Sequence, residues 1–283
     1  MQNPNHSRAL RTCRNRYIPP RPAILTALHR LMEDAEPDLH QVSDLLQRDV
    51  SLSAAVLRTV NSAFFGMRGR VSDIRQAVVL LGVQRIANLV SAYELRRAMT
   101  GKAAISMERF WDSAQRVAEV CVWVGRSLEP PVPLEDLYAT GLFRDCGIPI
   151  MALCFTDYLA VLKEANASTE EPLTAFEDRR YETNHSQAGH ALAEAWGLPE
   201  LIGEMALQHH ETDYWNGQPE RSHRQVMALL LVAERIVDGC QGRPENADWL
   251  TNGPHALQEL GLNAQAFEAL SLEVRERMEP MPA

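Results

Sequence analysis

Residues 141–147 read Gly141-Leu142-Phe143-Arg144-Asp145-Cys146-Gly147. They close a helix that the apolar spacing predicts over residues 134–145, because Gly147 and Pro149 interrupt helical backbone directly afterwards. A carboxylate at such a helix end, here Asp145, can point into a cleft and bridge metal ions. The neighbouring Arg144 is permanently charged and cannot ligate a metal. The stretch therefore combines a ligand-type residue with one that opposes metal binding.

Further residues of ligand type follow Asp145 along the chain, namely His185, His209, His210 and Glu234. Histidine and carboxylate side chains carried by separate helices are the ligands that metallohydrolases use. Two adjacent histidines diverge by about 100° on a helix, so His209 and His210 can serve two neighbouring sites, or one ligand position and one supporting role. Each residue also has a simpler interpretation: a helix-terminal histidine complements the macrodipole, and Arg144 can pair with Asp145 or Glu234.

Nearly every segment after residue 22 repeats its apolar residues with helical spacing, and almost none alternates like a strand. Asp49 and Asn184 are expected to cap helices, and Gly82 to separate two of them. The sequence therefore predicts an all-α fold with two helical lobes. The predicted helices cover residues 23–35, 39–47, 51–62, 73–81, 83–99, 107–128, 134–145, 150–165, 172–181, 185–196, 199–210, 225–240, 255–260 and 264–278.

Composition is that of a soluble globular protein, with 283 residues, 46% hydrophobic and 23% charged. The formal net charge of −9 argues against non-specific binding of nucleic acid, which depends on Lys and Arg. No apolar stretch is long enough to cross a bilayer. The five cysteines form no CxxC pair and are interpreted as free thiols in a reducing compartment. A cytoplasmic location is therefore expected.

The segments around the ligand-type residues resemble the HDOD family, the HD-related output domains of bacterial signalling proteins. Residues 141–147 are similar to the "GLLHDIG" segment of HD-superfamily phosphohydrolases. Two later segments are similar to the family's "DHAEVG" and "WGLP…HHE" motifs, namely Asn184-His185-Ser186-Gln187-Ala188-Gly189 and Trp196-Gly197-Leu198-Pro199 with Gln208-His209-His210-Glu211. Three upstream segments match the amino-terminal half of HDOD domains, namely Ile18-Pro19-Pro20-Arg21-Pro22, Leu57-Arg58-Thr59-Val60-Asn61-Ser62-Ala63-Phe64-Phe65-Gly66 and Gln76-Ala77-Val78-Val79-Leu80-Leu81-Gly82.

The resemblance implies a two-lobed HDOD fold whose second lobe is a degenerate HD-like helical bundle. Residues 1–17, which carry four arginines, are expected to form a mobile basic tail. Residues 18–100 would form the N-terminal helical lobe and residues 101–215 the HD-like lobe. Residues 216–283 would then supply C-terminal helices that pack on the HD-like lobe.

The departures from the family pattern bear most directly on function. HD hydrolases carry a first His on the long helix, where Asp112 matches here, and a His-Asp pair, where Arg144 replaces the His. Glu234 stands where the last Asp is expected. At 4 Å and an effective dielectric near 20, Arg144 would repel each unit of metal charge by about 4 kcal/mol. No cofactor is therefore expected, although a residual divalent-metal site from Asp112, Asp145, His185, His209, His210 and Glu234 remains open.

We therefore expect a non-catalytic bacterial signalling module that binds a partner protein or a small ligand, such as a nucleotide or cyclic dinucleotide. Arg144, Asp145, His185, His209 and His210 are the candidate ligand-binding residues. One alternative is a metal-dependent phosphohydrolase with a reduced metal site. Another is a DNA-binding regulator, because the helices over residues 39–47 and 51–62 resemble a helix-turn-helix. The second of these helices has only one basic residue, which favours a role in the core.

Overall fold

The computed structural model describes residues 17–34, 36–65, 69–99, 103–128, 131–217 and 219–278. Within these ranges every regular element is a helix, which confirms the predicted all-α fold. The proposed basic tail lies outside the described residues except for Tyr17. The helices are α2 (Ala23–Met32), α3 (Leu39–Gln47), α4 (Val50–Val60), α5 (Ile74–Leu81), α6 (Val83–Ala98), α7 (Met107–Gly125), α8 (Leu134–Phe143), α9 (Gly147–Cys154), α10 (Tyr158–Asn166), α11 (Leu173–Tyr181), α12 (His185–Trp196), α13 (Glu200–Gln208), the 3-10 turn η2 (Tyr214–Gly217), α14 (Arg221–Cys240), α15 (Ala247–Glu259) and α16 (Ala264–Met278).

Local sequence signals place several helix ends where they were expected. The Asp49 carboxylate accepts a hydrogen bond from the Leu52 N–H at the start of α4, and the Asn184 side chain accepts one from Gln187 at the start of α12. Gly82 has a φ of 80°, a conformation that glycine adopts without steric cost, and it separates α5 from α6.

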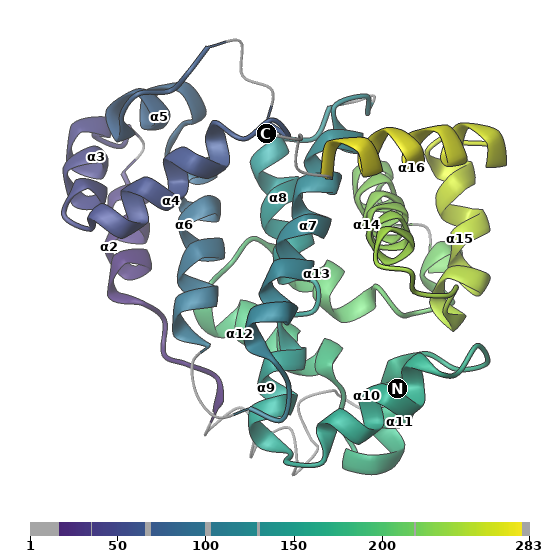
Figure 1. Cartoon of the computed structure of the whole chain (residues 1–283). Helices are drawn as coiled ribbons and strands as arrows, with labels where there is room; N and C mark the ends of the chain where they lie inside the picture. The colour runs from purple at the N-terminus through teal and green to yellow at the C-terminus, as the bar shows by residue number, and fades with distance from the viewer. Residues whose placement is uncertain are drawn as a thin grey trace.

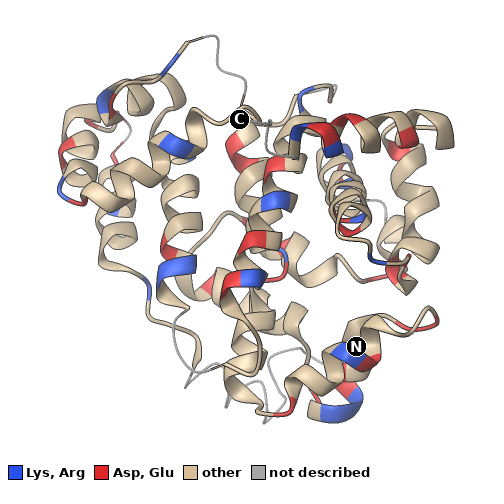
Figure 2. Ribbon diagram, in the orientation of Figure 1, with Lys and Arg blue, Asp and Glu red and all other residues tan. Residues whose placement is uncertain are grey.

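The long helix α7 lies between α6 and α14 (Figure 1), and two hydrophobic cores meet at it. One core is continuous from α2–α6 into α7, α8, α9 and α12. The other joins the opposite face of α7 to α14, α15 and α16. Basic and acidic positions are spread over helices of both lobes (Figure 2). Helix α7 is therefore buried on two sides, which accounts for its nearly unbroken apolar run from Val117 to Val124.

The Pro-rich segment before α2 packs on the second lobe. The Trp196 indole N–H donates to the carbonyl oxygen of Pro19 at 3.0 Å, and the Trp196 ring is fully buried. The Arg21 guanidinium lies beside Gly197, the residue that ends α12. Two motifs that are far apart in sequence thus meet at one contact between the lobes.

The helix predicted over residues 150–165 is two helices in the structure. Helix α9 ends at Cys154 because Phe155 adopts extended backbone angles. The Phe155 ring then stacks on Tyr181 at the end of α11, with ring centroids 4.0 Å apart. This tertiary contact overrides the helical periodicity, which alone gave no sign of a break.

The C-terminal helices begin earlier than predicted. Helix α15 starts at Ala247, where Asn246 accepts a hydrogen bond from Trp249, and it continues through Pro254. The proline removes only the backbone bond to Leu250, a residue on the exposed side of the helix. Helix α14 begins at Arg221, one turn before the predicted start.

Cysteine chemistry follows the expectation only in part. Cys121, Cys146 and Cys240 are free thiols, whereas Cys154 is disulfide-bonded, contrary to the expectation that all five are free. Among the described residues, no helix combines the length and apolar character that a membrane span requires.

Candidate metal and ligand site

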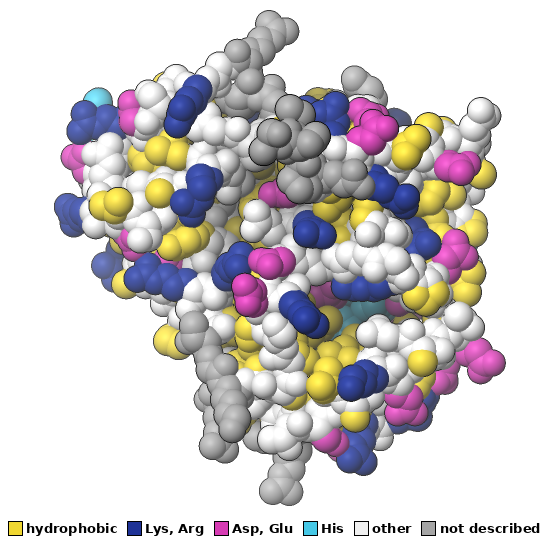
Figure 3. Space-filling view, viewed as in Figure 1, with side chains coloured by type: hydrophobic (Ala, Val, Ile, Leu, Met, Phe, Trp, Pro, Cys, Tyr) yellow, Lys and Arg dark blue, Asp and Glu magenta, His cyan; other side chains and the backbone are white. Residues whose placement is uncertain are grey.

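A hollow on the face shown in Figure 3 has histidine at its base. It lies between the C-terminal helices and the segment that contains α10 and α11. The cluster formed by Asp145, His185, His209 and His210 brings together four ligand atoms, one from each residue, that all lie within 4.8 Å of one another. The structure thus assembles four of the six residues that the sequence suggested as metal ligands.

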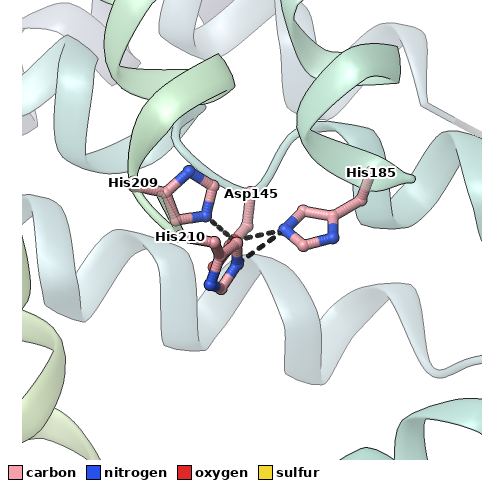
Figure 4. Close-up of side chains that lie close together, drawn as sticks. All are labelled: Asp145, His185, His209 and His210. Atoms are coloured by element: carbon pink, nitrogen blue, oxygen red, sulfur yellow. Dashed lines mark hydrogen bonds and ion pairs between the residues drawn. The ribbon is translucent and has the colours of Figure 1, made fainter. Parts of the chain in front are cut away.

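The four side chains of this cluster converge from three places in the fold (Figure 4). Asp145 follows the end of α8, His185 opens α12, and His209 and His210 follow α13. The Nε2 atom of His209 lies 3.1 Å from Asp145 Oδ1, and that of His185 lies 3.6 Å from the same oxygen. The Nε2 atoms of His185 and His210 are 3.0 Å apart. All three histidines therefore direct Nε2 towards one small volume.

Each histidine also has an oxygen atom close to its Nδ1, on the side of the ring that faces away from the cluster. His185 Nδ1 lies 2.7 Å from Glu177 Oε2, and His210 Nδ1 lies 2.9 Å from Asp248 Oδ1. His209 Nδ1 lies 3.1 Å from the carbonyl oxygens of Met205 and Ala206. The acceptors at His185 and His209 place a proton on Nδ1 and leave the Nε2 lone pairs facing the cluster. At His210 the charge of the nearby Asp248 carboxylate favours the same tautomer, although the contact lacks hydrogen-bond geometry. Metal-ligating histidines are oriented by this kind of support.

The contacts inside the cluster need a positive charge between them. With the Nδ1 proton in place, Nε2 of a neutral His209 faces the Asp145 carboxylate, and two Nε2 lone pairs face each other between His185 and His210. Burial opposes charging His185, but the charges of Glu177 and Asp145 outweigh it and raise its pKa to about 10. A protonated His185 can donate to His210. A metal ion bound by the four side chains would resolve every one of these contacts, so the donor set fits a divalent cation.

Glu177 is a supporting residue that the sequence did not reveal. Its carboxylate is fully buried, accepts both the Nδ1–H and the backbone N–H of His185, and also accepts a hydrogen bond from the Tyr158 hydroxyl. Asp248 was missed for a related reason, since it lies in the part of α15 that was predicted as loop. The sequence offers only its position, an acid eight residues before a candidate ligand, and the burial of Glu177 is visible only in the structure.

Arg144 and Glu234 lie beside the cluster as an ion pair. One Arg144 nitrogen lies 2.7 Å from Asp145 Oδ2 and 3.0 Å from Glu234 Oε1, and the side chain is only 8% exposed. Burial disfavours the charge, but Asp145 and Glu234 outweigh it and raise the Arg144 pKa. Burial likewise acts to raise the pKa of Asp145, which the guanidinium and the histidines instead hold well below its usual range.

The expected repulsion between Arg144 and a metal ion is therefore largely offset. The guanidinium pairs with the carboxylates of Asp145 and Glu234. Two further carboxylates, those of Glu177 and Asp248, lie against His185 and His210. With neutral histidines and ionised acids, the region carries a net charge of minus three. The repulsion expected from the sequence counted Arg144 without the carboxylates that the fold brings to it.

Asp112 does not join the cluster. It lies on α7, its side chain is 57% exposed, and it pairs with Arg96 of α6 at 3.3 Å. The adjacent Trp111 fills the core instead. The expectation that Asp112 could act as a metal ligand is therefore not supported by its position.

The helical scaffold and the Asp–His cluster define a protein of the HD-related class. The chain belongs to the HDOD family, whose HDOD domain model matches residues 18–212. A relative from Treponema pallidum (strain Nichols), an uncharacterized protein, is 27% identical over 225 residues. That match covers 78% of this chain but only 43% of the relative.

Solved structures share the fold. An HDOD domain protein with unknown function from Geobacter sulfurreducens aligns with a TM-score of 0.65 and 21% identity, covering 94% of this chain and 95% of that one. A protein from Shewanella amazonensis SB2B, provisionally named a phosphohydrolase, aligns with a TM-score of 0.67 and 20% identity. The alignment covers 97% of this chain and 99% of that one. A protein from Marinobacter aquaeolei VT8, provisionally named a signal transduction protein, aligns with a TM-score of 0.68 and 19% identity. The alignment covers 95% of this chain and 62% of that one. At these identities the similarity concerns the fold.

Glu177→Gln is expected to weaken Zn²⁺ binding about 10- to 100-fold, because the neutral amide no longer strengthens His185 as a ligand. Competition against a chromophoric chelator measures the affinity. Glu171→Gln is the matched control, since Glu171 is exposed and pairs only with Arg179 among the described residues. Equal affinities for the two variants would contradict the supporting role of Glu177.

Proposed function

We propose that this chain is a signal-transduction module without hydrolase activity, which retains one metal position of an HD-type site and binds a partner protein or small ligand. The observation that carries the proposal is the buried Arg144 guanidinium between Asp145 and Glu234. Two-metal hydrolysis needs a second ion a few ångströms from the first, to activate water and clamp the phosphate. Here a fixed organic cation engages the carboxylate oxygens that such an ion would use.

Replacing that cation with a metal ion would be costly. A second ion sharing Asp145 would have to break a buried ion pair, and removing one partner from such a pair costs about 3–5 kcal/mol. Asp112, the residue at the matching position on α7, is too exposed and too well paired with Arg96 to help. The local residues thus favour a single ion.

The retained position has the ligand count of a closed site. Asp145 with His185, His209 and His210 supplies four protein ligands, and sites with four protein ligands are usually structural, whereas catalytic zinc sites keep a position open for water. A bound ion would supply Lewis-acid character and cross-link α8, α12 and α13. The protein residues orient the imidazoles and enclose them in a buried, acidic environment.

A mononuclear phosphohydrolase is the second candidate function, and the same Asp–His cluster is what favours it. Protein loaded with Mn²⁺, Fe²⁺ or Zn²⁺ is expected to hydrolyse bis-p-nitrophenyl phosphate and a cyclic dinucleotide no faster than Asp145→Ala with the same metal. Metal-dependent turnover that disappears in Asp145→Ala would establish the enzyme and refute the signalling proposal in its non-catalytic form.

Two other expectations receive less support. Arg144 was proposed to bind an anionic ligand directly, but one of its nitrogens serves two carboxylates. Its Nε and Nη1 have no hydrogen-bond partner among the described residues, but both are buried, so an anion would have to enter the core to reach them. DNA binding through α4 is disfavoured because that helix buries Leu52, Val56 and Val60 in the core. A cytoplasmic location and a protein partner remain part of the proposal.

A further inference from the structure

A second cavity lies between the two lobes, apart from the Asp–His cluster. It has a volume of about 310 Å³ and is bounded by α4 and α6 of the N-terminal lobe and by α7 and α8 of the second lobe. In Figure 2, helices α4, α6 and α7 each carry basic positions in the part of the ribbon that faces the viewer. None of the four residues of the Asp–His cluster lines this cavity.

Arginine and unpartnered donors give the cavity an affinity for anions. Arg58 and Arg96 both line it. Among the described residues no carboxylate pairs with Arg58, whereas Arg96 uses one nitrogen for an exposed ion pair with Asp112 at 3.3 Å and would have to share its charge with a bound anion. The Trp111 indole N–H and the Ser62 hydroxyl line the same cavity, and both are buried without a hydrogen-bond partner within the described part of the chain. Buried donors are normally satisfied, so two of them in one cavity indicate a missing ligand or water.

Flat side chains and one carboxylate complete the lining. Trp111 and Tyr138 present aromatic surface, and Tyr93 lies at the partly exposed side. Glu119 lies further along α7 and accepts a hydrogen bond from Gln115 at 3.0 Å. No arginine or lysine within the described ranges forms an ion pair with Glu119. The cavity thus offers cations, aromatic surface and a hydrogen-bond-accepting carboxylate.

We propose that this inter-lobe cavity binds a guanine nucleotide, with Arg58 and Arg96 contacting phosphate and Glu119 accepting hydrogen bonds from the base. Guanidinium groups suit phosphate oxygens. Guanine has two adjacent donors on its Watson–Crick edge, which match the two oxygens of a carboxylate, whereas adenine offers one. Aromatic side chains add stacking with the base.

Such a ligand would contact both lobes at once. Helix α8 lines the cavity through Tyr138 and Leu142, and it ends at Phe143, directly before Arg144 and the Asp–His cluster. A nucleotide that binds one packing of the lobes better than another would shift the population towards it. The site requires neither an occupied metal position nor an absent one, so it stands independently of the functional proposal.

Isothermal titration calorimetry on the full chain tests the proposal with GMP, GDP, AMP, guanosine and inorganic phosphate. GMP and GDP are expected to bind saturably, and at least about tenfold more tightly than AMP, guanosine or phosphate. Arg58→Ala and Arg96→Ala should each weaken GMP binding about tenfold or more. Glu119→Gln should reduce the preference for GMP over AMP.

Matched variants make the outcome decisive. Arg75→Ala is the control, because Arg75 is an exposed arginine that pairs with Asp44 on the outside of the N-terminal lobe. It should bind GMP like the wild type. The proposal is overturned if guanine nucleotides show no saturable binding at concentrations up to about 1 mM. Equal affinity for GMP and phosphate would also overturn it. So would GMP binding that persists in both arginine variants but is lost in Asp145→Ala. Circular dichroism confirms that each variant is folded.

Discussion

Protein stripped of metal and then equilibrated with Zn²⁺ is expected to bind one ion per chain, and His185→Ala and His209→Ala are expected to bind none. Each change removes one of four converging ligands, and a three-ligand remnant beside the Arg144 guanidinium has lost both a donor and its geometry. Plasma mass spectrometry after dialysis measures the stoichiometry.

His190→Ala is the matched control for the histidine variants. His190 lies on α12, the helix that His185 opens, but its Nδ1 lies 3.1 Å from the Gly203 carbonyl oxygen and it takes no part in the cluster. It should retain one ion per chain. Binding of two ions by the wild-type protein would contradict the inference that Arg144 occupies the second position.

Two further measurements distinguish a closed site from an open one. Co²⁺ in place of Zn²⁺ should give the intense visible absorption of a four-coordinate site rather than the weak bands of six-coordination. Zn²⁺ at 100 times its Kd should stabilise the folded state by about 2.7 kcal/mol, because it binds the native cluster and not the unfolded chain. The same addition should leave the unfolding midpoint of His185→Ala unchanged.

The fold could be predicted because its determinants are local and periodic. The Asn184 cap and the Gly82 separator act on neighbouring residues only, and both occur where the sequence placed them. The predicted helices over residues 150–165 and 255–260 had wrong bounds, because contacts and caps outside the predicted segments decide where α9 and α15 end and begin. Phe155 ends α9 and stacks on Tyr181, and α15 begins early at the Asn246 cap and continues through Pro254.

In the candidate site, too, some residues could be predicted from local motifs, whereas the roles of others depend on tertiary packing. Asp145 and the three histidines lie in recognisable segments, so their convergence followed from ancestry. Asp112 was assigned by position in a motif, but the direction of its side chain depends on how α7 packs, and it faces Arg96 and solvent. Whether Arg144 repels or replaces an ion depended on Glu234, 90 residues away in the chain. Charge compensation over that separation is invisible without coordinates.

Gly147→Ala is expected to destabilise the fold by about 3 kcal/mol and to abolish metal binding. A Cβ at this position would lie 1.8 Å from the carbonyl oxygen of His185 and 2.8 Å from the backbone nitrogen of Gly189, so α9 and α12 would have to move apart. That contact holds Asp145 against His185, so adding one methyl group at Gly147 should disrupt the ligand cluster.

Urea denaturation measures the free energy of unfolding of Gly147→Ala, and chelator competition measures its metal affinity. Gly239→Ala provides the matched control, because a Cβ there meets no atom within 4 Å and the residue lies in α14. Replacing a helical glycine in open space should raise stability by about 0.5–1 kcal/mol and leave metal binding intact. If Gly147→Ala lost stability but kept one ion at wild-type affinity, the α9–α12 contact would serve folding alone, and the Asp145–His185 geometry would have to be maintained by Glu177 and Arg144 instead.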